Sequence, residues 1–218
     1  MSILLLKGRV LMFINKIREN YDINQPIFSE DILKLFPDYS RAYVFRLIKK
    51  AEDSGELAKF STGVYYLPRK TFFGISTITA DDVIRRRYIS WNDDVYGIYS
   101  GLSLLNFFFV TTQVPNVLEV VTNNETTRVR EISLDGRRFI LRKSRFEINK
   151  DNENAYMILQ LFSDLEKNEK VDEYAIERII DFIQKNEITR KQLLSLSVYF
   201  PARAIKNMIR FGLLNEIA

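Results

Sequence analysis

The hydrophobic period of this chain changes from helical to alternating within its first seventy residues. Apolar side chains recur at helical spacings of three and four in residues 10–17, 29–36 and 41–55. Residues 57–67 instead alternate on either side of Ser61-Thr62-Gly63, a pattern that predicts a β-hairpin. Three helices followed by a hairpin is the element order of a winged helix-turn-helix. We therefore expect such a domain over residues 1–70.

Local signals predict where these helices begin and end. Ser29 is expected to be the N-cap of the second helix, with Glu30 and Asp31 in its first turn. Residues 36–40 have the composition of a turn, and Gly55 is expected to follow the end of the third helix.

The third predicted helix separates apolar from cationic side chains. At 100° per residue, one arc holds Val44, Phe45, Leu47, Ile48 and Ala51, and the opposite arc is basic. A helix that enters the major groove of DNA needs cations for phosphates and an arginine for guanine. The hairpin could add contacts to the sugar-phosphate backbone. The predicted DNA-binding residues are Arg41, Tyr43, Arg46, Lys49, Lys50, Lys59, Ser61 and Thr62. A basic face that only keeps a three-helix domain soluble is the alternative.

Charge is unevenly distributed along the chain. Residues 1–70 carry 12 basic and 8 acidic side chains, whereas residues 151–218 carry 9 and 11. Two stretches, 39–50 and 137–145, contain basic residues and no acid. In the second stretch, Arg138, Arg142 and Lys143 form a possible second contact with a polyanion. The alternative is the solvated face of a half-exposed sheet.

Residues 71–218 are expected to form a second domain of mixed α/β structure. Residues 71–78 resemble a linker, and Thr79-Ala80-Asp81-Asp82 fits a capping box that opens a helix ending near Trp91. The further expected elements are a helix at 102–109, a turn at 111–115, a buried strand at 117–122, and a hairpin over 127–143 that turns at Asp135-Gly136. The predicted hairpin is antiparallel.

The C-terminal part has helical periodicity. Helices are expected near 155–166, 172–185, 189–196 and 201–211. The predicted fold class is therefore α+β: an N-terminal winged helix-turn-helix, then a mixed α/β region with an antiparallel hairpin, then a helical C-terminal tail.

Composition limits the available chemistry. The chain of 218 residues contains no histidine and no cysteine. This excludes Ser-His-Asp triads, thiolate nucleophiles, and metal sites built on imidazole or sulfur. No glycine-rich phosphate loop is present among its 8 glycines. We expect no enzyme activity, no cofactor and no metal.

Two groups of carboxylates leave an alternative open. Asp81 and Asp82 could hold a metal, although their place in a helix's first turn accounts for them. Glu119, Glu131 and Asp135 could be arranged as in a carboxylate nuclease. A metal-dependent nucleic-acid-processing enzyme, targeted by its winged helix, is therefore the second hypothesis.

The sequence predicts a cytoplasmic protein without membrane contact. The start lacks the basic region, the long apolar core and the cleavage site of a signal peptide. No stretch reaches the roughly 18 uncharged apolar residues that a membrane span needs.

A series of short motifs, in order, resembles a known family. They are Ser61-Thr-Gly-Val-Tyr-Tyr-Leu-Pro68, Tyr99-Ser-Gly-Leu-Ser-Leu-Leu-Asn106, Thr111-Thr-Gln-Val-Pro115, Val121-Thr-Asn123 and Asp135-Gly-Arg137. Over about residues 8–145 the chain resembles the AbiEi-type antitoxins of abortive-infection (type IV) toxin–antitoxin systems. The resemblance implies an N-terminal winged helix that represses its own operon by binding the upstream operator. It also implies a second domain that counteracts a nucleotidyltransferase-like toxin encoded next door. The first hypothesis is therefore an autorepressor and antitoxin in phage defence, with duplex DNA and the cognate toxin as partners. A winged helix used only for protein contacts remains a third option.

Overall fold

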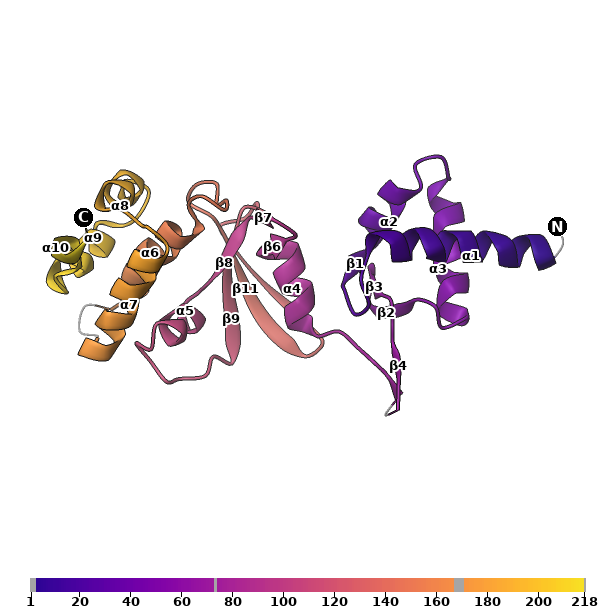
Figure 1. The fold of residues 1–218 in the computed structure, drawn as a ribbon, viewed down its shortest axis with the longest axis horizontal. Coiled ribbons are helices and arrows are strands. Elements are labelled where there is room, and N and C mark those ends of the chain that lie inside the picture. The colour runs from indigo at the N-terminus through magenta and orange to yellow at the C-terminus, as the bar shows by residue number, and fades with distance from the viewer. Residues whose placement is uncertain (1–2, 73, 167–170, 218) are drawn as a thin grey trace. The chain divides into compact units, whose positions relative to one another are not determined.

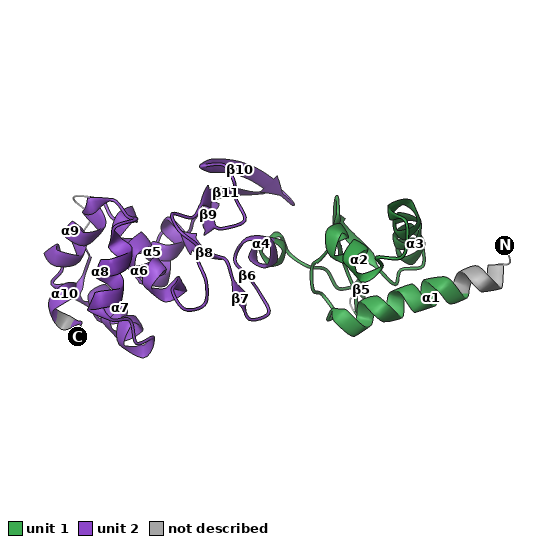
Figure 2. Cartoon of the chain, turned by 90° about the horizontal axis from the view of Figure 1, so that it is seen from above, with its two compact units in different colours: residues 1–83 green, residues 84–218 purple. Residues whose placement is uncertain are grey.

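The chain separates into two units, each with its own hydrophobic core (Figure 2). The structure is a computed structural model that describes residues 3–72, 74–166 and 171–217. Unit 1 comprises residues 1–83 and unit 2 comprises residues 84–218. The division lies inside helix α4 (Ala80–Tyr88), thirteen residues beyond the boundary expected at residue 70. The mixed α+β composition, with helices at both ends of the chain, is as predicted.

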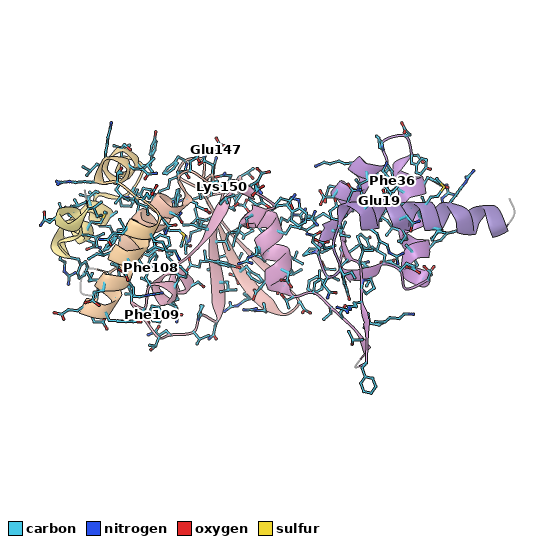
Figure 3. All side chains as sticks on the ribbon, viewed as in Figure 1. Glu19, Phe36, Phe108, Phe109, Glu147 and Lys150 are labelled. Atoms are coloured by element: carbon cyan, nitrogen blue, oxygen red, sulfur yellow. The ribbon has the colours of Figure 1, made fainter. Side chains whose placement is uncertain are left out.

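Three helices form most of unit 1 (Figure 1). They are α1 (Ile3–Asn20), α2 (Ser29–Leu35) and α3 (Arg41–Asp53). Phe13, Ile14 and Ile17 bury one face of α1, because their spacing brings them to the same side of the helix. Phe36, labelled in Figure 3, follows α2 and stacks on Phe13 with ring centroids 4.7 Å apart.

The ends of α2 and α3 have different chemistry. Ser40 caps α3, since its side chain accepts a hydrogen bond from the Tyr43 backbone N–H. Ser29 was expected to cap α2 in the same way, and this was wrong. Phe28 occupies the N-cap position without a side-chain cap, and Ser29 is already helical. The Ser29 backbone N–H instead donates to the Gly63 carbonyl at 2.9 Å, which ties the start of α2 to the hairpin.

The predicted hairpin of unit 1 is present as part of a three-stranded antiparallel sheet. Its strands are β1 (Ile27–Phe28), β2 (Ala58–Ser61) and β3 (Val64–Tyr66), in the order β1-β3-β2. The turn between β2 and β3 requires a glycine at Gly63, where φ is +74°. The register shifts between Lys59 and Ser61, which marks a bulge in β2.

The segment expected to be a linker contains a short hairpin instead. Its strands are β4 (Lys70–Thr71) and β5 (Gly74–Ile75). The Thr71 hydroxyl donates to the Gly74 carbonyl, and the Ser76 hydroxyl donates to Asn24 Oδ1 at 2.6 Å. Side-chain hydrogen bonds thus order a stretch that has no clear apolar pattern.

Unit 2 is built on a four-stranded mixed sheet. Its strands are β8 (Gly97–Ser100), β9 (Val117–Thr122), β10 (Val129–Leu134) and β11 (Arg137–Lys143), in the order β10-β11-β9-β8. β9 and β11 are parallel, and the other neighbours are antiparallel. Asp135 and Gly136 both have positive φ, as a type I′ turn requires, so the predicted 127–143 hairpin is confirmed. A smaller hairpin pairs β6 (Ser90–Trp91) with β7 (Asp94–Val95).

Helices cover both faces of this sheet (Figure 1). Arg130, on the face that also buries Phe139 and Leu141, donates to the Tyr88 hydroxyl at the end of α4. The helices α5 (Leu102–Phe107) and α6 (Glu153–Asp164) share a core with Ile98 and Val121 of the other face. At the start of α4, Thr79 and Asp82 exchange the hydrogen bonds of the predicted capping box.

The four helices expected in the C-terminal part are present as α6, α7 (Glu173–Lys185), α8 (Arg190–Ser197) and α9 (Ala202–Arg210). The short α10 (Leu213–Glu216) was not predicted. Phe108, labelled in Figure 3 at the end of α5, packs edge-on against Phe182 of α7. None of the helices in the described ranges is both long and apolar enough to cross a membrane.

Candidate functional site

The outer face of α3 is polar and solvent-exposed. Val44, Leu47, Ile48 and Ala51 are buried in the core of unit 1. Arg41, Ala42, Arg46 and Lys49 are exposed, and Lys50 is half-buried. The helix therefore presents cations on the side that does not pack, as its sequence predicts.

Tyr43 lies at the centre of a small cluster on this surface. The Arg46 guanidinium lies 5.5 Å from the centroid of the Tyr43 ring, within cation–π range. Arg9 of α1 donates to the Tyr43 hydroxyl at 3.4 Å, and this bond raises the pKa of Arg9. Tyr39 packs edge-on against the same ring. Tyr43 is half-buried and contacts both Arg46 and Arg9.

Arg9 was missed by the sequence reasoning. It lies 34 residues before Tyr43, on a different helix. Arg9 is exposed, but nothing in the sequence indicated which residue it contacts. The basic surface formed by Arg9, Arg41, Arg46, Lys49 and Lys50 is called the α3 basic face below.

Two lysines and an arginine of the α3 basic face differ in their partners. Lys49 forms an ion pair with Asp53, one turn later, at 2.9 Å, and this bond raises the pKa of Lys49. The Arg41 guanidinium lies 5.5 Å from the Phe45 ring centroid, near the start of α3. Lys50 has no acidic partner within the part of the chain that the structure describes.

The hairpin residues predicted to contact DNA lie on β2 and its turn. Lys59 and Thr62 are exposed, whereas Ser61 is half-buried. β2 packs against α3, so these residues and the α3 basic face belong to neighbouring elements of unit 1.

The second predicted basic contact lies on β11 in unit 2. Arg138 lies 3.4 Å from Glu131 of β10. The Arg142 Nε donates to Glu119 Oε2 of β9 at 2.9 Å. Lys143 is exposed and alternates to the opposite face from these two arginines. The three cations are therefore not on one face, and two of them have carboxylate partners.

The carboxylates considered for a metal site are engaged elsewhere or spread apart. Asp82 serves the capping box, and Glu119 and Glu131 pair with arginines. Asp135 occupies the β10–β11 turn. Within residues 3–72, 74–166 and 171–217, no group of three acidic side chains is placed to hold a metal ion.

Unit 2 also contains a cleft that the sequence reasoning missed. It has a volume of about 710 Å³ and is called the arginine cleft below. Its charged and polar residues are Glu119, Arg142, Arg145, Gln160, Asp164, Glu166 and Arg203. Asp164 accepts hydrogen bonds from the Gly101 backbone N–H at 3.0 Å and from the Gln160 side chain at 2.8 Å. Burial raises the pKa of Asp164.

The signal for this cleft was an acid at the end of a largely apolar helix. Asp164 ends α6, in which eight residues are buried. A carboxylate in such a place needs hydrogen-bond partners, but the sequence does not show that Gly101 supplies one from 63 residues away.

The comparisons with known proteins give a family and no function. A family model described as a "Family of unknown function (DUF6088)" matches residues 25–191. No curated protein matches the chain. The matched region runs from just before β1 into α8, and so includes α3, the hairpins, the sheet of unit 2 and α6. Because the match covers most of the chain, this protein belongs to the DUF6088 family.

Proposed function

We propose that the protein is a cytoplasmic DNA-binding repressor whose unit 1 acts as a winged helix-turn-helix. The observation that carries this proposal is the α3 basic face, exposed on a helix of 13 residues. In such a domain the helix enters the major groove and the β2–β3 hairpin lies along the backbone. The element order α1, β1, α2, α3, β2, β3 supports this proposal.

The contacts suggest a division of roles within the α3 basic face. Arg46 lies in the middle of the exposed arc and is oriented by Tyr43, so it is the residue we assign to base reading. Lys50, Lys59 and Arg9 are assigned to phosphates, which they can neutralise without reading sequence. Lys49 contributes less, since Asp53 competes for its charge.

The experiment for this proposal measures binding to duplex DNA from upstream of the protein's own operon. Fluorescence anisotropy at two salt concentrations should give an affinity that falls as salt rises. Arg46→Ala should weaken binding by about tenfold to a hundredfold, as expected for loss of a base contact. Lys34→Ala, which removes an exposed cation of α2, is the matched control. Equal affinity of the two variants would refute the assignment of α3.

We further propose that the protein is an antitoxin and represses its own operon. This proposal rests on the resemblance to AbiEi-type antitoxins in the motifs between residues 61 and 137. Co-expression with the neighbouring nucleotidyltransferase-like reading frame should rescue growth. Arg46→Ala should lose repression of a reporter yet keep this rescue, because the substitution leaves unit 2 unchanged. Failure of the wild-type chain to rescue growth would contradict the antitoxin role and leave the DNA-binding proposal intact.

A further inference from the structure

The arginine cleft lies between the sheet of unit 2 and three of its helices. Gly101 and Leu102 lead into α5, Asp164 ends α6, and Arg203 lies in the first turn of α9. Glu119 and Arg142 come from β9 and β11. A volume of about 710 Å³ is within the range of small-molecule sites.

Three acids line the cleft: Glu119 and Asp164 have partners within it, and Glu166 is exposed. Glu119 is paired with Arg142 at 2.9 Å, so these two charges offset each other. Asp164 is held by the Gly101 N–H and by Gln160. Burial also favours the neutral form of its carboxyl group and so raises its pKa.

Two arginines of the cleft form no ion pair, although the charge of Arg203 acts on the Asp164 carboxyl group and opposes the rise in its pKa. Neither the Arg145 nor the Arg203 guanidinium forms a hydrogen bond or ion pair with any residue in the described ranges. The Arg145 guanidinium lies 5.2 Å from the Phe200 ring centroid, which leaves its N–H groups available. Leu102 and Leu105 give the same cleft an apolar wall.

We propose that the arginine cleft binds a small phosphate-bearing molecule of about the size of a nucleoside monophosphate. Arg145 and Arg203 bind the phosphate, and the organic part lies against Leu102 and Leu105. A phosphate monoester carries a charge of about −1.5 to −2 at neutral pH, which matches two guanidinium groups better than a single carboxylate does. Gln160, whose amide nitrogen is used by Asp164, keeps its carbonyl oxygen for a donor on the ligand.

The test is calorimetric titration of the full-length protein with adenosine 5′-monophosphate. The wild type should bind, and Arg145→Gln with Arg203→Gln should bind about a hundredfold more weakly, because the variant loses the charge-assisted hydrogen bonds to the phosphate. Lys206→Gln is the matched control, because it removes a cation from α9 outside the cleft. Its affinity should stay within about twofold of the wild type. Each single arginine variant is titrated too, so the result does not depend on the double variant being folded.

Two further probes test the chemistry of recognition. Inorganic phosphate should bind more weakly than the nucleotide, because it lacks the organic part, and succinate should bind more weakly still. The proposal is overturned if the wild type binds none of the three probes, or if the arginine variants bind the nucleotide as the wild type does. It is equally overturned if succinate or inorganic phosphate binds as tightly as the nucleotide. DNA binding by unit 1 is measured separately, so the two proposals stand or fall independently.

Discussion

The chain has two basic stretches without a single acid, and their arginines and lysines have different neighbours in the folded protein. Residues 39–50 form most of α3, and residues 137–145 include β11. On α3, Arg46 and Lys50 have no acidic partner among the described residues. On β11, Arg138 lies beside Glu131 and Arg142 beside Glu119, which come from the two neighbouring strands.

The difference follows from the geometry of helices and sheets. On an isolated helix face, the neighbours of a side chain are three or four residues away in sequence. An acid-free stretch therefore predicts a positive surface, and only Lys49 meets an acid, Asp53, just beyond the stretch. In a sheet, the neighbours lie on other strands, here up to 23 residues away. A basic run in a strand thus says little about the charge of its surface.

The largest expected effect is on DNA affinity, which should depend on the basic stretch of α3 and not on that of β11. Arg46→Ala combined with Lys50→Ala should weaken duplex binding by about a hundredfold or more and flatten its salt dependence. Arg138→Ala combined with Arg142→Ala should change affinity by no more than about threefold, because both arginines already have carboxylate partners. Anisotropy titrations of both double variants at two salt concentrations provide the measurement.

A larger loss of DNA affinity in the β11 variant would contradict this prediction. If the β11 variant lost more affinity than the α3 variant, the hairpin of unit 2 would be the main polyanion contact. A thermal melt of each variant serves as the folding control.

The next prediction compares how much each of the two ion pairs of β11 contributes to the free energy of unfolding. Glu119→Gln keeps the shape of the side chain but removes the charge opposite Arg142, and should lower the free energy of unfolding by roughly 1 kcal/mol. Glu131→Gln should lower it by only a few tenths of a kcal/mol, since both members of its pair are more than half exposed. Urea denaturation of both variants measures the difference. Equal losses would mean that partial burial does not strengthen the Glu119–Arg142 pair.

A smaller effect concerns the pH dependence of stability in the arginine cleft. Burial raises the pKa of Asp164, so the folded protein favours the protonated form of this carboxyl group. The resulting stabilisation is fully present below the ordinary pKa of an aspartate. It is lost as the pH rises through the pKa that Asp164 has in the folded protein. Asp164→Asn removes this titration. The urea-denaturation midpoint of the variant should therefore rise relative to that of the wild type as the pH is raised from 4 to 8. Asp151→Asn, at an exposed position, is the matched control.

The smallest effect concerns the one lysine of α3 that has an acidic neighbour. Asp53→Asn frees Lys49 and should strengthen DNA binding by about twofold to threefold, because one phosphate contact no longer competes with an ion pair. Stability should change by less than about 0.5 kcal/mol, as for an exposed i,i+4 pair. No gain in affinity would indicate that Lys49 lies outside the DNA contact.

The sequence was sufficient for elements whose signals are local. The spacing of Val44, Leu47 and Ile48 predicted the buried face of α3, and Asp135-Gly136 predicted the turn of the β10–β11 hairpin. The capping box of Thr79 and Asp82 needs only three residues of separation. The β4–β5 hairpin was missed because hydrogen bonds to Asn24 and Arg69, rather than apolar alternation, order it.

The candidate sites were predictable to the extent that they lie on a single element. Arg46 and Lys50 could be assigned to one helix face from their spacing alone. The contact of Arg9 with Tyr43 and the arginine cleft depend on packing between segments that are tens of residues apart. Neither charge counts nor periodicity carries that information.

Gly101 and Glu119 are sterically linked in a way that bears on the evolution of the family. Gly101 has φ +59°, and a Cβ there would lie 2.7 Å from Glu119 Oε1. A side chain at position 101 therefore requires the Glu119 carboxylate to shift or to be replaced by a smaller group, and either change disturbs its ion pair with Arg142. Across DUF6088 sequences, these three positions should vary together: relatives with a non-glycine residue at 101 should also have lost the acid at 119 and the arginine at 142.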